Sequence, residues 1–281
     1  MFESLRAVPA DPILNLSILY RQDTNPNKVD LGVGVYKDEA GHTAIMEAVS
    51  RAQELILVEE DTKAYVGMAG SKRYCDLLVQ TTLGVDHTVL TNNRFAVAQT
   101  PGGSGALRVL AEFINVSKPG ATVWAGNPTW ANHSPIMQSA GLEIKQYPYY
   151  DKDTKAVDFD GMLATLKAET KAGDVVLLHA CCHNPSGADL SLEQWQATAD
   201  VIKAKGLLPY VDIAYQGLGE GMDEDAAGLR LMANTVPEMV IASSCSKNFG
   251  VYRERTGTAI IISSNADQAK IAQSQMNSVI R

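Results

Sequence analysis

Three segments of the sequence place a reactive or anion-binding group directly after an apolar run. The first, residues 100–108, is rich in glycine and leads from the apolar run 95–99 into a helical pattern over 106–113. Backbone N–H groups at such a junction can converge on an anion, and the amino end of a helix adds partial positive charge. Because the segment matches neither a Walker A loop nor GxGxxG, a tight turn that needs positive φ explains it equally well.

An acid and a lysine follow two further apolar runs. Asp212 ends the run 207–212, and the carboxyl end of a buried parallel strand is where open α/β sheets place their ligands. A helix N-cap is the alternative role for this aspartate. Lys247 lies among small residues after the run 239–243; if it is desolvated, its amine loses a proton readily and becomes a nucleophile. A solvated loop lysine is the alternative.

Together these segments predict a phosphate seat, a partner for a pyridine nitrogen and a Schiff-base amine at one edge of a sheet. A phosphorylated aldehyde cofactor requires those three groups. The anion seat, the acid and the lysine can meet only if the apolar runs before them are strands that bring them to the same edge of one sheet. The elements that position them therefore decide whether the chemistry is available.

The chain alternates apolar runs with helical patterns, which predicts an α/β fold with a mostly parallel, doubly wound sheet. The runs are continuous enough in apolar character to need helices on both faces. The clearest helix begins at Ser191, with Gln194 completing a capping box and Trp195, Ala199 and Ile202 on one face. The predicted strands are residues 95–99, 122–125, 143–147, 175–179, 207–212, 239–243 and 258–262.

The first part of the chain does not alternate apolar runs with helical patterns, and it contains several turn-forming glycine and proline residues. We interpret residues 1–43 as an N-terminal arm with part of a small domain, and residues 44–281 as one large domain. A last helical pattern opens near Asn265.

Composition excludes several classes of protein. The 281 residues carry a formal charge of −8, so a broad basic surface for nucleic acid is not expected. With 46% hydrophobic residues the chain is not disordered, and we find neither a membrane span nor a signal peptide. Four cysteines without a CxxC pair fit a reducing compartment, so a cytoplasmic location is expected.

Three ordered motifs carry a resemblance to a known family. Asn184-Pro-Ser-Gly187, Asp212-Ile-Ala-Tyr215 and Ser244-Cys-Ser-Lys-Asn-Phe-Gly250 resemble class I aminotransferases of the aspartate and aromatic amino acid branch. Further matches lie at 11–14, 31–37 and 127–130. The resemblance implies a fold-type-I, pyridoxal-phosphate enzyme with a seven-stranded sheet. It also implies a ping-pong, Schiff-base exchange of amino groups between aspartate or aromatic amino acids and 2-oxoglutarate.

The resemblance also implies the roles of individual cofactor-binding residues. Lys247 would bond the cofactor aldehyde, Asp212 would pair with the ring nitrogen, and Asn184 and Tyr215 would hydrogen-bond the phenolic oxygen. We place Lys247, Asp212 and Tyr215 in the catalytic set. Trp130 would stack on the ring, and the phosphate would be held by Gly103, Ser104, Ser244 and Arg255.

Substrate binding is implied to involve two subunits. Gly34 would lie beside the substrate α-carboxylate, with Trp130 and Asn184 nearby. Tyr65 matches a tyrosine that reaches the phosphate in the neighbouring subunit, and Arg281 matches an arginine that reads a dicarboxylic side chain across the dimer. The expected partners are therefore amino acid and 2-oxo acid substrates and a second copy of the chain.

Two features of the sequence keep alternatives open. The family's C-terminal part, including the arginine that clamps the α-carboxylate, is absent from this sequence, so an incomplete fragment or pseudo-enzyme that retains cofactor binding is the second hypothesis.

His179 and His183 have a spacing found in zinc sites on helices. A zinc hydrolase is therefore the third hypothesis. Because the first histidine ends a predicted strand and the second lies in a loop, we expect no metal. We expect His179 and His133 to pack near the cofactor ring, and Cys181 and Cys182 to act as small buried hydrophobes.

Overall fold

The computed structural model describes residues 2–6, 12–30, 32 and 34–281. The chain divides into two compact units, residues 1–44 and 45–281. The N-terminal unit contains the short helix η1 (Phe2–Ser4) and helix α1 (Pro12–Gln22). An ion pair of 2.6 Å joins Lys37 to Asp30 within it. The match at residues 11–14 includes residue 11, which lies outside the described residues.

The large unit is built on a seven-stranded sheet with the order β1-β9-β8-β7-β6-β2-β3. Strands β3, β2, β6, β7 and β8 run parallel to one another, whereas β9 is antiparallel to its neighbours β1 and β8. All the predicted strands are confirmed, with ends that differ slightly. They are β1 (Phe95–Pro101), β2 (Thr122–Asn127), β3 (Glu143–Pro148), β6 (Val175–His179), β7 (Leu208–Ile213), β8 (Met239–Ser244) and β9 (Thr256–Ile262).

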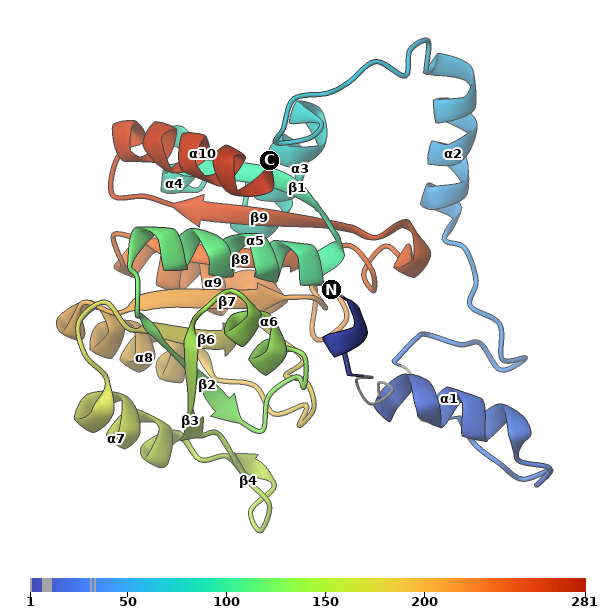
Figure 1. Ribbon diagram of the computed structural model, residues 1–281, viewed down its shortest axis with the longest axis horizontal. Coiled ribbons are helices and arrows are strands. Elements are labelled where there is room, and N and C mark those ends of the chain that lie inside the picture. Colours follow the sequence, from blue (N-terminus) through green and yellow to red (C-terminus); the bar gives the residue numbers. More distant parts are fainter. Residues whose placement is uncertain (1, 7–11, 31, 33) are drawn as a thin grey trace. The chain divides into compact units, whose positions relative to one another are not determined.

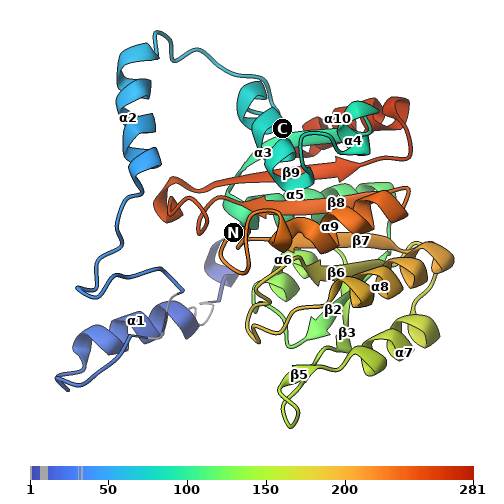
Figure 2. The same ribbon diagram turned by 180° about the vertical axis from the view of Figure 1, so that it is seen from behind.

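Helices cover both faces of this sheet, which makes a three-layer unit. One face is covered by α5 (Gly102–Ser117), α6 (His133–Ser139) and α10 (Ala266–Ile280), which lie in front of the sheet in Figure 1. The other face carries α3 (Lys72–Leu83), α7 (Phe159–Glu169), α8 (Leu192–Lys205) and α9 (Glu224–Thr235), seen from behind in Figure 2. The remaining elements are α2 (Glu47–Glu59), α4 (Thr88–Thr91), the hairpin β4 (Tyr150–Asp151) and β5 (Ala156–Val157), and η2 (Tyr252–Glu254).

Alternate residues of one strand enter different cores, and this explains the continuous apolar runs. In β6, Val175 and Leu177 pack with α5, α6 and α10, whereas Val176 and Leu178 pack with α7, α8 and α9. Side chains of a strand point to opposite faces in turn. A strand covered on both sides must therefore be apolar at every position.

The sequence around the first turns of helices α8 and α5 determines where these helices begin. Ser191 and Gln194 form the predicted capping box, and Trp195, Ala199 and Ile202 are buried as expected. Helix α5 begins at Gly102, four residues before the predicted helical pattern, so the glycine-rich segment forms the first helical turn rather than a separate loop. In the described part of the chain no helix is long and apolar enough to cross a bilayer.

Candidate functional site

The carboxyl ends of the central parallel strands meet at one edge of the sheet. His179, the last residue of β6, pairs in register with Asp212 of β7, and Asp212 pairs with Ala242 of β8. Ser244 ends β8, and the segment carrying Lys247 follows it. Because the strand directions agree, groups that are distant in the sequence lie side by side here.

These ends form a pocket with about 610 Å³ of empty space, including its open mouth. The structure brings together here most of the residues predicted for the cofactor: Gly103, Ser104, Trp130, Asn184, Asp212, Tyr215, Ser244, Lys247 and Arg255. His179 lines the pocket too, in agreement with its predicted place. Leu107, Ala214 and Ser246 complete the lining and were not predicted, although Ser246 stands in the small-residue segment before Lys247.

Gly34 belongs to the N-terminal unit, and its role stays a prediction. Two predicted residues of the large unit do not line this pocket. Tyr65 lies between α2 and α3 with its side chain fully exposed, at 107% of the reference area. Arg281 is the exposed C-cap of α10. Since Tyr65 and Arg281 were predicted to act across a dimer, their roles stay predictions.

Asp212 is a buried carboxylate held by a histidine. The Nε2 atom of His133 lies 3.0 Å from Asp212 Oδ2, and its Nδ1 atom lies 2.7 Å from the hydroxyl of Thr129. Because an ionised carboxylate only accepts hydrogen bonds, Nε2 is the donor. Burial acts to raise the pKa of Asp212, but the hydrogen bond from His133 and the nearby amine of Lys247 lower it, and the net shift is downward. Asp212 is therefore ionised and can hold a proton on a cationic ring nitrogen.

Behind Asp212 three histidine rings lie in a row. His133 and His179 have ring centroids 5.1 Å apart, and His179 and His183 are 4.3 Å apart. His183 is stacked on Tyr149 at 4.0 Å. Burial lowers the pKa of His179 to about 3 and that of His183 to about 4, so both rings are neutral at pH 7.

The histidine row does not have the geometry expected of the predicted zinc alternative. His179 ends a strand and His183 follows in a loop, as the sequence indicated, so they share no helix face. His133, His179 and Asp212 have potential ligand atoms within 4.8 Å of one another. However, both ring nitrogens of His133 are already hydrogen-bonded, to Thr129 and to Asp212. The Nε2 atom of His179 is buried without a hydrogen-bond partner.

Lys247 is the nucleophile candidate of the pocket. Burial lowers the pKa of its amine and the positive charge of Arg255 adds to that, while Asp212 acts in the opposite direction. Its Nζ atom lies 4.9 Å from the centroid of the Tyr215 ring. A lysine with a lowered pKa has a larger neutral fraction, which is the reactive form. Lys247 is half-buried in the pocket lining, and its role as the nucleophile stays a prediction.

Tyr215 and Asn184 are two further polar residues of the pocket lining. The Asn184 side chain acts to lower the pKa of the Tyr215 hydroxyl. Burial raises the pKa of that hydroxyl, with the charge of Asp212 adding to it, so the tyrosine is a neutral donor. The amide and the hydroxyl can both contact one oxygen of a bound ring.

The start of helix α5 and Arg255 form the part of the pocket that can bind an anion. A Cβ at Gly103 would come within 2.9 Å of Ser244 Cβ, and one at Gly102 would come within 2.9 Å of a guanidinium nitrogen of Arg255. Gly102 also has a φ of +75°, which an L side chain rarely adopts. These contacts require glycine. The first N–H groups of α5 and the planar cation of Arg255 therefore meet at one point, where phosphate binds well.

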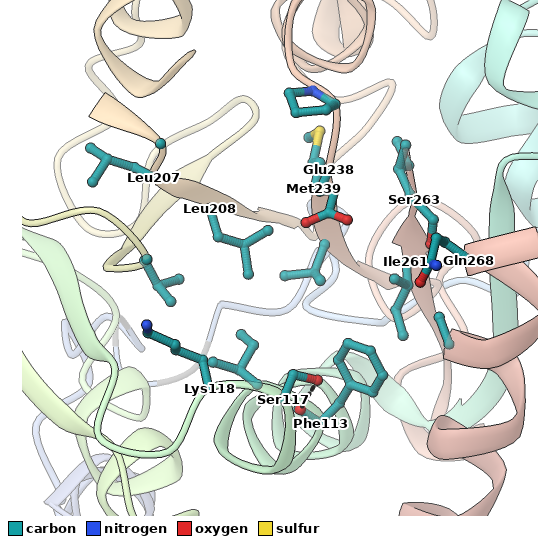
Figure 3. Close-up of a pocket in the computed structure, with 18 of the residues that line it drawn as sticks. Phe113, Ser117, Lys118, Leu207, Leu208, Glu238, Met239, Ile261, Ser263 and Gln268 are labelled. Atoms are coloured by element: carbon teal, nitrogen blue, oxygen red, sulfur yellow. Dashed lines mark hydrogen bonds between the residues drawn. The ribbon is translucent and has the colours of Figure 1, made fainter. Parts of the chain in front are cut away.

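A larger cavity with about 1390 Å³ of empty space lies at the opposite edge of the sheet. Its lining is mainly apolar and comes from the amino ends of β6–β8, from the end of β9, and from α5 and α10; Figure 3 shows Phe113, Leu208 and Ile261 facing it. It contains none of the predicted site residues. The chemistry therefore belongs to the smaller pocket at the carboxyl edge.

Comparisons with known proteins agree with this assignment of the pocket. The family model "Aminotransferase class I and II" matches residues 26–280. The aspartate aminotransferase of Salmonella typhi is 46% identical over 281 residues, which is 100% of this chain and 71% of that protein. The aromatic-amino-acid aminotransferase of Paracoccus denitrificans is 46% identical over 276 residues, 98% of this chain and 69% of that protein. A crystal structure of the aromatic-amino-acid aminotransferase of Burkholderia pseudomallei, described as covalently bound to pyridoxal phosphate, has a TM-score of 0.97 and 41% identity, and the match covers 100% of this chain and 70% of that one.

The buried histidines predict an acid-sensitive fold. Below about pH 6.5 the unfolded chain protonates His179 and His183, whereas the folded chain resists protonation until about pH 3 and about pH 4. The free energy of unfolding should fall between pH 6.5 and 4, by up to about 1.4 kcal/mol per pH unit for each histidine. Urea unfolding across this range should show a shallower slope in His183→Gln. The exposed His42→Gln is the control, and equal slopes for His183→Gln and the parent chain would contradict the prediction.

Proposed function

Because this chain belongs to the class I and II aminotransferases, a family of transaminases whose cofactor is pyridoxal phosphate, we propose that it exchanges amino groups between aspartate or an aromatic amino acid and 2-oxoglutarate, in ping-pong order. The observation that carries the proposal is one pocket with Asp212 at one end, Arg255 and the start of α5 at the other, and Lys247 among them.

The residues present fit the cofactor. The close approach of Gly103 to Ser244 leaves a cradle that side chains would fill, and the unpartnered Nε2 of His179 is a buried polar atom that lines the pocket. When bound, pyridoxal phosphate supplies an electron sink conjugated to the substrate nitrogen. Gly103, Ser104, Ser244 and Arg255 would hold its phosphate, and Trp130 would cover one ring face.

Asp212 and Lys247 then have separate tasks. Asp212 holds a proton on the ring nitrogen, and unit charges about 4 Å apart attract by about 4 kcal/mol in a partly screened site. With the cofactor bound, Lys247 would hold it through its amine. Once the substrate amine has taken that place, the free Nζ atom would accept the proton of the substrate Cα and donate it to the cofactor carbon that carried the aldehyde.

The first test concerns the attachment of the cofactor. Borohydride reduction of the loaded protein, followed by peptide mapping, should find one pyridoxyl group on Lys247. Lys247→Ala should lose the label and nearly all activity. Lys203→Ala, which removes an exposed lysine from α8, should keep both. A label on another lysine would remove the proposal, whereas a label on Lys247 without turnover would support the alternative of a non-catalytic chain that retains cofactor binding.

The second test concerns the amino donor. Proteins named for aspartate and proteins named for aromatic amino acids match this chain with similar identity, 46% in both examples above. An arginine at position 281 suits a distal carboxylate, and we propose that the chain uses both donors. Turnover of aspartate and phenylalanine with 2-oxoglutarate should be comparable, and double-reciprocal plots at several donor concentrations should be parallel. A preference of several hundredfold for one donor would contradict dual use.

We further propose that the chain acts as a symmetric homodimer. No residue of α2 is buried, and the apolar side chains of Leu55, Ile56, Leu57 and Val58 are all exposed. Four exposed apolar residues in a row are unusual for a free surface. A twofold interface buries the same patch on both chains and would bring Tyr65 of one chain toward the phosphate of the other.

A mixing experiment tests the shared site. Lys247→Ala lacks the amine, and the double variant Tyr65→Phe, Arg281→Ala lacks the two residues predicted to cross the dimer. Heterodimers of the two would contain one undamaged site, so the mixture should be more active than either parent. If mass spectrometry shows exchange of subunits and activity does not rise, Tyr65 and Arg281 do not serve the partner's site.

A further inference from the structure

The loop after β6 holds two adjacent thiols in a fixed conformation. Cys181 is buried and Cys182 is half-buried, with its backbone at a φ of +48°. The N–H groups of Cys182 and His183 donate to the carboxylate of Asp189 at 2.6 and 2.8 Å. The sulfur atoms of Cys181 and Cys182 lie within 4.8 Å of each other. The loop therefore presents both sulfurs together rather than on opposite sides.

A carboxylate at the start of helix α9 completes the group. Asp225, in the first turn of α9, accepts hydrogen bonds from the N–H groups of Gly217, Gly219 and Glu220 at 2.8–2.9 Å. The ligand atoms of Cys181, Cys182 and Asp225 all lie within 4.8 Å of one another. Two sulfurs bound to one zinc-like ion at about 2.3 Å can be at most about 4.6 Å apart. With every pair of ligand atoms within 4.8 Å, the three groups need only a small movement to share one ion.

From this geometry we propose that Cys181, Cys182 and Asp225 form a binding site for a soft or borderline divalent cation such as Zn²⁺ or Cd²⁺. Two sulfurs and one oxygen are the donors that such ions prefer, and a fourth position stays open to water. The carboxylates of Asp189 and Asp225 make the surroundings negative, and among the described residues neither forms an ion pair with a lysine or arginine. The site therefore attracts a cation.

Binding must displace protons from the thiols. Burial raises the pKa of Cys181 and of Cys182, and the nearby aspartates raise both further. The reaction is therefore one cation plus two thiols giving a dithiolate complex and two released protons. Binding is weaker than at preformed thiolates, and thiol-seeking Cd²⁺ is the more sensitive probe.

The site is connected to the cofactor pocket through both loops. Cys182 lies two residues before Asn184, and Asp225 holds Gly217, two residues after Tyr215. A cation that draws the Asp225 oxygens would weaken the hydrogen bonds of the 217–220 loop and shift Tyr215 against Asn184. This step rests on the proposed function, and it predicts weaker binding of pyridoxal phosphate when the cation is bound.

The binding experiment uses the cofactor-free chain with CdCl₂ alone, followed by the ultraviolet thiolate-to-metal absorption and by equilibrium dialysis. The parent chain should bind one ion with the absorption of two thiolates. Cys182→Ser should lose most of that absorption and bind at least tenfold more weakly, and Cys181→Ala should do the same. Cys75→Ser, which changes another buried thiol remote from the pair, is the matched control and should bind as the parent does.

Two results would overturn the site. Absence of the absorption in the parent chain would mean that the cysteines only fill space. An absorption that survives in Cys182→Ser and disappears in Cys75→Ser would place the ion elsewhere. Circular dichroism checks folding; if Cys181→Ala does not fold, the half-buried Cys182→Ser decides alone.

The coupling has its own measurement, made by titrating pyridoxal phosphate with and without Cd²⁺. The dissociation constant should rise several-fold in the parent chain and remain unchanged in Cys182→Ser. An unchanged constant while the absorption forms would overturn the coupling and leave the metal site standing. Failure of the metal-free parent to bind pyridoxal phosphate would instead contradict the proposed function.

Discussion

The buried charge of Asp212 is the constraint on which the arrangement of the pocket depends. An ionised carboxylate away from water costs several kcal/mol unless it is paired and hydrogen-bonded. Here His133 donates to it from α6, and Thr129 holds the other side of that ring. His179 and His183 are neutral at pH 7 because burial lowers the pKa of both rings. The carboxylate therefore stays ionised, and its negative charge is available to a group bound in the pocket.

Charge at the other end of the pocket has the opposite sign. Arg255 and the first turn of α5 supply positive potential, and close packing of Gly102 and Gly103 brings them together. Lys247 stands between these ends, where the arginine and burial favour its neutral form while the aspartate opposes them. A ligand with a cationic ring nitrogen and an anionic phosphate satisfies both ends at once. The same field keeps the amine reactive.

The segments that follow β6 and β7 connect the pocket to the proposed cation site. They carry Asn184 and Tyr215 in the pocket lining and Cys182 and Asp225 at the proposed site. The second loop is organised by one carboxylate that accepts three backbone N–H groups. Such a loop is well ordered only while that carboxylate keeps its donors. A cation that binds Asp225 in place of these N–H groups is therefore expected to shift Tyr215.

Much of the fold and the cofactor site could be predicted from local sequence. The strands are apolar at every position because both of their faces are covered, and the capping box of Ser191 and Gln194 marks a helix start without tertiary information. The motifs around Asn184, Asp212 and Lys247 identified residues that do line one pocket. By contrast, the antiparallel direction of β9, the bond from His133 to Asp212 and the meeting of Cys182 with Asp225 depend on contacts between residues far apart in the chain. The local sequence pattern shows which residues must be buried or capped, because those requirements are set within one strand or helix. Only the packing of the whole sheet decides which distant residue becomes the contact or hydrogen-bond partner of each one.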